Sequence, residues 1–157
     1  MVKTINIKSN KKIILAADHA GFELKEEIKK FLIKEGFEVE DKGAHSYNAK
    51  DDYTDFVFEA AKKVSADKNI RGIVFGASGQ GEAIAANKVK GIRAALYYGQ
   101  NMEIVKLSRT HNNANILSLG ARFLKKEEAI KSIKLWLKTE FSNEERHIRR
   151  VKKISEI

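Results

Sequence analysis

The chain has 157 residues, 43% of them hydrophobic, which is enough for one soluble domain around a single core. It contains no cysteine, which excludes disulfide bonds, thiolate metal ligands and a cysteine nucleophile and agrees with a reducing cytoplasm. No apolar run could cross a membrane, residues 1–11 lack the apolar core of a secretory signal, and the formal net charge of +9 favours anionic ligands.

Short apolar runs alternate with longer amphipathic segments along the chain. The short runs have the length of buried strands, and the longer ones place apolar side chains at helical spacing, as Phe22, Ile28 and Leu32 do. In chain order we expect a strand at residues 12–17, a helix at 22–36, a strand at 37–43, a helix at 53–68, a strand at 71–77, a short helix at 81–89, a strand at 91–98, a helix at 101–111, a strand at 115–121, a helix at 125–141 and a last helix at 143–157.

This alternation is typical of βαβ units, so we expect one doubly wound α/β domain over residues 1–157, with residues 1–11 as an N-terminal extension. Five parallel strands would be covered by helices on both faces. Ligands of such sheets bind beyond the carboxyl ends of the strands. We therefore expect the segments that follow the strands to converge at one edge, bringing together Asp18 and His19, residues 45–52, the glycine-rich loop after residue 75, residues 97–100, and Arg122.

The stretch GASGQGEAIAANK, residues 76–88, places three glycines between a strand and a helix. A P-loop would need a lysine and a serine or threonine after its last glycine, where Glu82 and Ala83 stand instead. The dinucleotide fingerprint would need its third glycine at Ile84. Two interpretations are left open. The loop amides hold an oxyanion at the helix N-terminus, or the glycines only permit a tight turn and close packing.

Glu82 is the more informative residue of this stretch. A carboxylate in the first turn of a helix interacts favourably with the helix dipole, which would be a purely structural role. Beside a row of N–H donors it could also be a general base that takes a proton next to a carbonyl. The dipole would lower its pKa and burial would raise it, and the sequence leaves that balance open.

Other polar residues also have both a structural and a functional interpretation. Asp18 could cap a helix beside a surface His19, and His111 lies where a helix ends in an asparagine-rich turn. Arg146 and Arg150 are four residues apart and share a helix face, which suits a phosphate dianion. Because the four histidines lack HxH or HExxH spacing and cysteine is absent, we expect no metal site.

Five segments of the chain form a recognisable series: AADHAGFELK, DDY (51–53), GASGQGEAIAANKVKGIRAAL, LSRTHNNANILSLGAR and RHIRRVKKI. In this order they resemble the motifs of the ribose-5-phosphate isomerase type B family, which includes the galactose-6-phosphate isomerase subunits. The family motifs are, in turn, the D-H-A-G-x-x-L-K signature, the D-Y-P segment (with Thr54 in place of proline here), the G-x-G-x-x-x-x-A-N-K-x-x-G-I-R-A block, the R-x-H-N-x-A-N-x-L-x-x-G-x-R block and R-H-x-x-R. Each motif by itself is moderately specific for this family. Five motifs in the same order, over about residues 12–154, are strongly specific for it.

The resemblance implies a three-layer αβα Rossmann-like sandwich with a five-stranded parallel sheet. It also implies a homodimer, in some members paired into tetramers, with an active site shared between subunits, to which the helix at residues 143–157 contributes. No metal or organic cofactor is used. The implied reaction interconverts an aldose phosphate and a ketose phosphate through a cis-enediol.

Residue roles follow from the same resemblance. Many members carry a cysteine base where this chain has Gly76, whereas a second subgroup uses a glutamate just after the last glycine of the loop, where this chain has Glu82. In that pattern Ser78 and the loop amides stabilise the enediolate oxygen, and His111 assists ring opening. The substrate-binding positions are Asp18 for sugar oxygens, His19, Arg146 and Arg150 for the phosphate, Asn112 and Arg122 for positioning, Tyr53, and the loop residues Gly76, Ala77, Gly79 and Gly81.

We therefore expect interconversion of D-ribose 5-phosphate and D-ribulose 5-phosphate, a step of the non-oxidative pentose phosphate pathway. The nearest alternative is the same chemistry on galactose 6-phosphate, allose 6-phosphate or a tetrulose phosphate. A non-catalytic module that binds a sugar phosphate or nucleotide would explain the glycine loop, but not Glu82 and His111 occurring together with the arginines. Nucleic-acid binding is disfavoured, because the lysines are interleaved with acidic residues along most of the chain.

Overall fold

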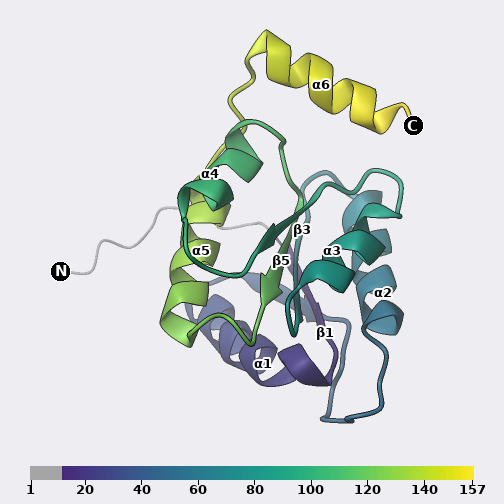
Figure 1. Cartoon of the computed structure of the whole chain (residues 1–157), viewed down its shortest axis with the longest axis vertical. Coiled ribbons are helices and arrows are strands. Elements are labelled where there is room, and N and C mark those ends of the chain that lie inside the picture. The colour runs from purple at the N-terminus through teal and green to yellow at the C-terminus, as the bar shows by residue number, and fades with distance from the viewer. Residues whose placement is uncertain (1–11) are drawn as a thin grey trace, which may run out of the picture.

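The computed structural model describes residues 12–157, and our expectation for residues 1–11 lies outside them. Strands and helices alternate along this part of the chain and a final helix follows (Figure 1). In chain order the elements are β1 (Lys12–Ala17), α1 (His19–Lys34), β2 (Glu38–Asp41), α2 (Tyr53–Ala66), β3 (Arg71–Gly76), α3 (Gln80–Asn87), β4 (Ala94–Tyr97), α4 (Glu103–Thr110), β5 (Ile116–Gly120), α5 (Lys126–Lys138) and α6 (Glu145–Ser155).

The strands form one five-stranded sheet in the order β2-β1-β3-β5-β4, and every pairing is parallel. The expected α/β fold with a five-stranded parallel sheet is therefore confirmed. The expected strand at residues 91–98 is shorter at its start. The backbone N–H of Arg93 there donates to the Asn115 side chain at 2.8 Å instead of to a strand neighbour.

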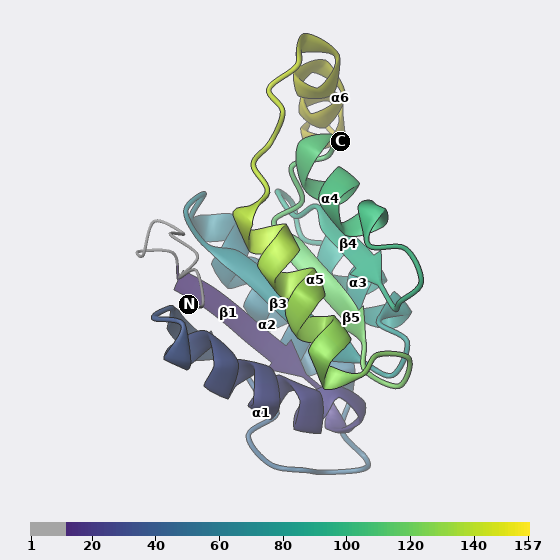
Figure 2. The ribbon, with the colours of Figure 1, turned by 90° about the vertical axis from the view of Figure 1, so that its left-hand side faces the viewer.

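Helices cover both faces of the sheet: α1, α4 and α5 pack on one face, and α2 and α3 pack on the other (Figures 1 and 2). Each face of the sheet has its own hydrophobic core, and the side chains of strand β1 contribute to both. Ile13 and Leu15 belong to the cluster that contains Trp136 of α5, whereas Ile14 packs against α2 and α3. Burying each such aliphatic side chain contributes about 1.5–3 kcal/mol.

The start of α1 is held very close to β3. A Cβ atom at Gly21 would lie 2.5 Å from the carbonyl oxygen of Phe75, so only glycine fits without a shift of the backbone. This close approach places Asp18 and His19, at the start of α1, beside the loop that follows β3.

Helix α6 stands away from the rest of the molecule (Figures 1 and 2). Only His147 of this helix is buried, and the apolar side chains of Ile148 and Ile154 are 48% and 52% exposed. Its connection to the body includes Ser142, whose backbone N–H donates to the carbonyl of Thr110 at 3.1 Å. The apolar residues of this amphipathic helix are thus left largely uncovered within one chain.

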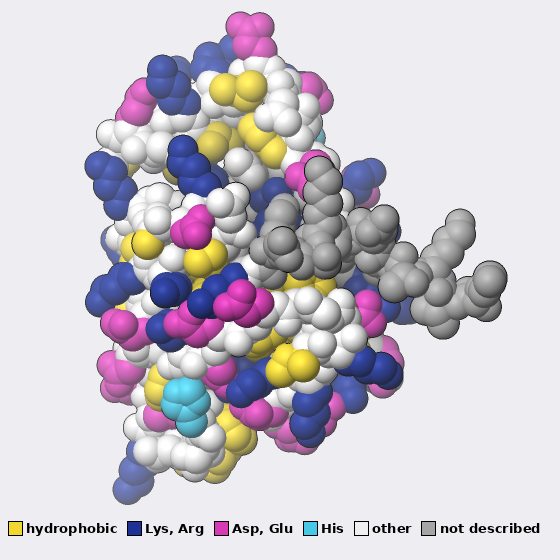
Figure 3. All heavy atoms as spheres, turned by 180° about the vertical axis from the view of Figure 1, so that it is seen from behind, with side chains coloured by type: hydrophobic (Ala, Val, Ile, Leu, Met, Phe, Trp, Pro, Cys, Tyr) yellow, Lys and Arg dark blue, Asp and Glu magenta, His cyan; other side chains and the backbone are white. Residues whose placement is uncertain are grey.

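The face of the molecule seen in Figure 3 carries Lys and Arg side chains interspersed with Asp and Glu, as expected from the interleaved charges of the sequence. Among residues 12–157, none of the helices is long and apolar enough to span a membrane.

Candidate active site

Segments that follow β1, β3 and β5 meet at the carboxyl edge of the sheet. The backbone N–H of Ala121 donates to the Gly76 carbonyl at 2.8 Å, and that of Arg122 donates to the Ala77 carbonyl at 3.1 Å. Tyr53, at the start of α2, packs closely over Gly81. A Cβ atom added to Gly81 would lie 2.7 Å from the Tyr53 hydroxyl oxygen. The first three post-strand segments and Arg122 therefore surround one location.

The loop after β3 ends in a left-handed glycine. Gly79 is the N-cap residue of α3 and has φ +78°. Because it has no side chain, it cannot cap the N-terminus of the helix with a side-chain hydrogen bond. Ser78 Oγ lies 3.3 Å from the backbone nitrogen of Gln80 and accepts its N–H. The N–H of Ala83 donates to the Gly79 carbonyl at 3.0 Å, and the N–H of Glu82 bonds its own carboxylate, so the N–H of Gly81 is the group of this first turn that can serve an anionic oxygen placed over the loop.

Glu82 turns back over the start of this loop. A Cβ atom built on Gly76 would overlap its carboxylate, so the carboxylate occupies the space that a side chain at position 76 would fill. Glu82 is only 4% exposed, and this burial raises its pKa. A backbone hydrogen bond opposes that rise, and the nearby charge of Asp18 adds to it. The sequence left open whether burial or the helix dipole dominates the pKa of Glu82. In the structure the net effect is a raised pKa, which makes Glu82 a stronger base.

Asp18 has the structural role that the sequence allowed, since its Oδ1 accepts the backbone N–H groups of Ala20 and Gly21 at 3.0 and 3.3 Å and caps α1. Its Oδ2 makes no hydrogen bond within the described residues. The adjacent His19 ring is held by Asp51, whose Oδ1 lies 2.7 Å from Nδ1. Sequence reasoning missed Asp51, although it stands directly before the D-Y pair of a quoted motif.

Donor atoms of Asp18, His19 and Asp51 lie within 4.8 Å of one another, so this trio is the group in the described chain that could approach a metal ion. The 2.7 Å contact between Nδ1 and the Asp51 carboxylate is a hydrogen bond, which already gives the two groups a partner.

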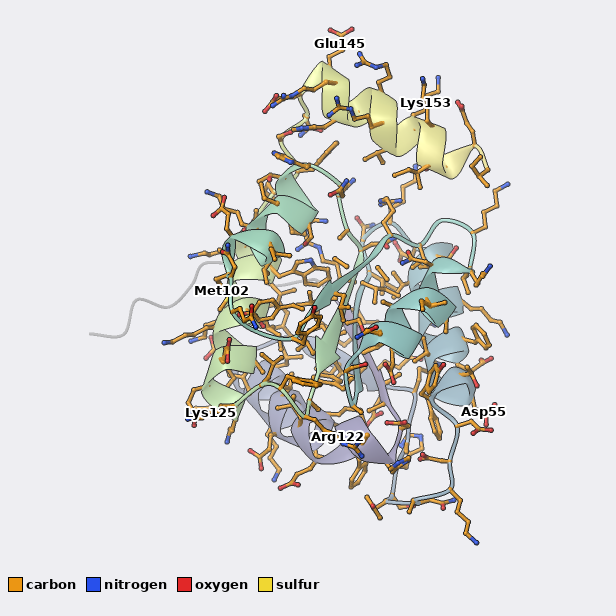
Figure 4. All side chains as sticks on the ribbon, in the orientation of Figure 1. Asp55, Met102, Arg122, Lys125, Glu145 and Lys153 are labelled. Atoms are coloured by element: carbon orange, nitrogen blue, oxygen red, sulfur yellow. The ribbon has the colours of Figure 1, made fainter. Side chains whose placement is uncertain are left out.

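The remaining predicted residues lie at the opposite end of the sheet. Helix α4 runs antiparallel to the strands, so His111 at its C-cap and the following Asn112 are at the amino edge. Arg146 and Arg150 of α6 are exposed at that same end, and Arg146 Nε donates to Glu144 at 2.9 Å. In Figure 4, the labelled Glu145 and Lys153 of α6 and the labelled Arg122 lie at opposite ends of the molecule.

His111 contacts a second histidine that sequence reasoning passed over. The rings of His111 and His147 are 4.2 Å apart at a tilt of 34°, and Ser142 Oγ is 2.8 Å from His147 Nδ1. Burial, followed by the nearby His111, lowers the pKa of His147. The R-H-x-x-R motif contains His147, and it was the sequence signal that could have identified this residue. One chain therefore presents two separate groups of residues: the Glu82 group at the carboxyl edge, and the His111 group with the arginines of α6 at the amino edge.

A family model described as Ribose/Galactose Isomerase matches residues 13–154 of this chain. The chain belongs to the ribose/galactose isomerase family. Among curated members, it is similar to ribose-5-phosphate isomerase B of Mycolicibacterium paratuberculosis, with 43% identity over 92% of this chain and 90% of that protein.

Solved structures of this family share the fold. Ribose-5-phosphate isomerase B of Mycoplasma genitalium with bound ribulose-5-phosphate matches with a TM-score of 0.88 and 40% identity, covering 93% of this chain and 95% of that one. The Clostridium thermocellum ribose-5-phosphate isomerase B matches with a TM-score of 0.87 and 46% identity, over 92% of this chain and 95% of that one. The family resemblance expected from the five motifs is confirmed.

Proposed function

We propose that this chain is an aldose–ketose isomerase that interconverts D-ribose 5-phosphate and D-ribulose 5-phosphate. The position of Glu82 is the observation that carries this proposal. Its buried carboxylate takes the space above Gly76, where a side chain at that position would lie, and it faces a loop of backbone donors. The names of the similar proteins, and the ribulose-5-phosphate bound in the Mycoplasma genitalium structure, support ribose 5-phosphate as the substrate.

In the proposed reaction Glu82 takes the proton from C2 of the open-chain aldose and returns it to C1. The negative charge that develops on the substrate oxygen is stabilised by the N–H groups of the loop and the start of α3, together with Ser78. Burial raises the pKa of Glu82, which strengthens it as a base against the opposing effect of the helix N-terminus. The cis-enediol is the intermediate: the carbonyl oxygen O1 gains a proton when C2 loses its proton, and the hydroxyl oxygen O2 loses its proton when C1 gains one, so that a hydroxyl proton passes from O2 to O1 and the ketose results.

The site is completed by a second copy of the chain in this proposal. His111, which would assist ring opening, and Arg146 and Arg150, which would bind the phosphate, lie at the amino edge, away from Glu82. A homodimer in which these residues reach the partner's carboxyl edge would unite the two groups. The exposed apolar residues of α6, which suit burial against a partner, support this arrangement.

The direct test is a panel of five- and six-carbon sugar phosphates assayed with the purified protein, together with exchange of the C2 proton of ribose 5-phosphate with solvent. We expect turnover and exchange with ribose 5-phosphate. Preference for galactose 6-phosphate, allose 6-phosphate or a tetrulose phosphate would change the substrate and keep the chemistry. Binding without exchange on any substrate would contradict an isomerase. The cytoplasm as the site of the reaction stays a prediction, for which cell fractionation is the measurement.

A further inference from the structure

We propose that Asp51 is a positioning residue for His19, and that it holds the imidazole in the form that binds the phosphate of the substrate. The nature of the ligand rests on the proposed function, whereas the geometry rests on contacts within one chain. His19 begins α1 and Asp51 lies two residues before α2, in the segment that follows β2, so the two residues are 32 positions apart in the sequence.

One carboxylate oxygen of Asp51 contacts His19 twice. Oδ1 accepts the backbone N–H of His19 at 3.0 Å and lies 2.7 Å from the ring atom Nδ1. An ionised carboxylate only accepts hydrogen bonds, so the proton of this contact belongs to Nδ1. The two bonds together hold a proton on Nδ1 and fix the orientation of the ring relative to the helix start.

The other ring nitrogen is left available. Nε2 of His19 has no hydrogen-bond partner within residues 12–157, and it is not one of the enclosed polar atoms. The His19 side chain is 25% exposed. A ligand that approaches the carboxyl edge can therefore reach this atom.

The burial of Asp51 points to the same role. Its side chain is 9% exposed, and His19 is the only positively chargeable side chain within ion-pair distance of it in the described part of the chain. Its Oδ2 is buried without a partner. A buried carboxylate is costly unless it is paired, so the contact with His19 is what accounts for its position.

The segment that carries Asp51 is itself anchored. Gly43 and Ala44 exchange backbone hydrogen bonds with Ala17 at the end of β1, at 2.8 and 2.6 Å, and the N–H of Asp51 donates to the Asn48 carbonyl at 3.1 Å. The carboxylate is thus presented to His19 from a folded segment tied to β1.

Phosphate oxygens need donors. When Nδ1–H is held by Asp51, a ring that also donates from Nε2 carries a positive charge, and the Asp51 carboxylate compensates that charge. Such a charge-assisted bond is stronger than a neutral one. Asp51 would consequently act on substrate affinity through His19, whereas Glu82 acts on the proton-transfer step.

The test compares Asp51→Ala and Asp51→Asn with Asp55→Asn in the full chain. Asp55, labelled in Figure 4, is exposed in the first turn of α2, so it provides the same loss of charge in the neighbouring helix. Long-range proton–nitrogen NMR of histidine-labelled protein reports which ring nitrogens of His19 carry a proton, and the His19 signals are assigned with a His19→Gln variant. Steady-state kinetics on ribose 5-phosphate and titration with inorganic phosphate report binding.

In Asp51→Ala we expect loss of the Nδ1–H form, a KM about tenfold higher and a kcat within about twofold of the wild type, because a charge-assisted bond is lost outside the chemical step. Weaker inorganic phosphate binding should accompany the change in KM. Asp51→Asn should be milder, since its amide oxygen can still accept from Nδ1, and Asp55→Asn should resemble the wild type.

Unchanged protonation of His19 Nδ1 in Asp51→Ala, or a loss of kcat at constant KM, would overturn the role of Asp51. If the wild type does not turn over ribose 5-phosphate, the proposed function fails, and the Nδ1 protonation and inorganic phosphate measurements still decide the role of Asp51. Should Asp51→Ala fail to fold, the phosphate titration of Asp51→Asn, which preserves the side-chain volume and removes the compensating charge, decides it: wild-type phosphate affinity overturns the proposal.

Discussion

At the scale of single residues, Gly76 and Glu82 are best understood as a pair. Because Gly76 has no side chain, the carboxylate of Glu82 can occupy the space next to it. A substitution at position 76 acts on both residues, because any side chain there would displace the carboxylate. The proposed base therefore depends on a glycine six residues before it.

Replacing Glu82 by glutamine should lower kcat by about 10²- to 10⁴-fold, the usual contribution of a positioned general base, with little change in KM. Steady-state kinetics on ribose 5-phosphate is the measurement. Glu103→Gln is the matched control, since Glu103 is an exposed acidic residue in the first turn of α4. Near-normal turnover of Glu82→Gln would remove Glu82 as the base.

Glu82 should also make stability depend on pH. Its pKa is raised from 4.5 on folding, so the folded state binds the proton more tightly, and the stability that results is present below pH 4.5 and lost as pH rises through the folded pKa. Because glutamine does not ionise, Glu82→Gln should melt at a higher temperature than the wild type at neutral pH. Melting temperatures recorded from pH 4 to 8 would refute this if the difference shrank as pH rose.

At the scale of elements, the site depends on how closely α1 approaches β3. Gly21 lies in the D-H-A-G motif, and its lack of a Cβ lets the helix start touch the Phe75 carbonyl. Asp18 caps the same helix and places its charge near Glu82. The packing of one helix on one strand thus brings two parts of the candidate site together.

Gly21→Ala should destabilise the fold by about 1–3 kcal/mol, the usual cost of overpacking, because the added Cβ must push α1 away from β3. Chemical denaturation measures the free energy of unfolding. Glu23→Ala, at an exposed position of the same helix, should change it by less than about 0.5 kcal/mol. Equal effects of the two substitutions would show that the close approach is unimportant.

At the scale of the whole molecule, the proposed dimer site can be tested with mixed dimers. Chains carrying Glu82→Gln and chains carrying His111→Asn are co-expressed with different tags, and the heterodimer is isolated through both tags. If each site takes Glu82 from one chain and His111 from the other, one of the two sites is intact, and we expect about half of the wild-type kcat per dimer.

The matched control pairs a wild-type chain with a chain that carries both substitutions. In a shared site this heterodimer has one defect in each site and should be inactive. If Glu82 and His111 of the same chain worked together, the results would be reversed, with activity in the control and none in the first heterodimer. Either result identifies the chain that supplies His111.

The amino-acid sequence by itself determined the local elements, the fold class and the family. Alternating apolar runs and amphipathic segments predict βαβ units because hydrophobic periodicity is a local property, and the five motifs lie in continuous stretches of chain. Only the tertiary structure decided the strand order β2-β1-β3-β5-β4 and the burial that raises the pKa of Glu82. It also separated His111 from Glu82 and joined Asp51 to His19, because these relations depend on which end of the sheet a segment reaches, and motif order does not specify that.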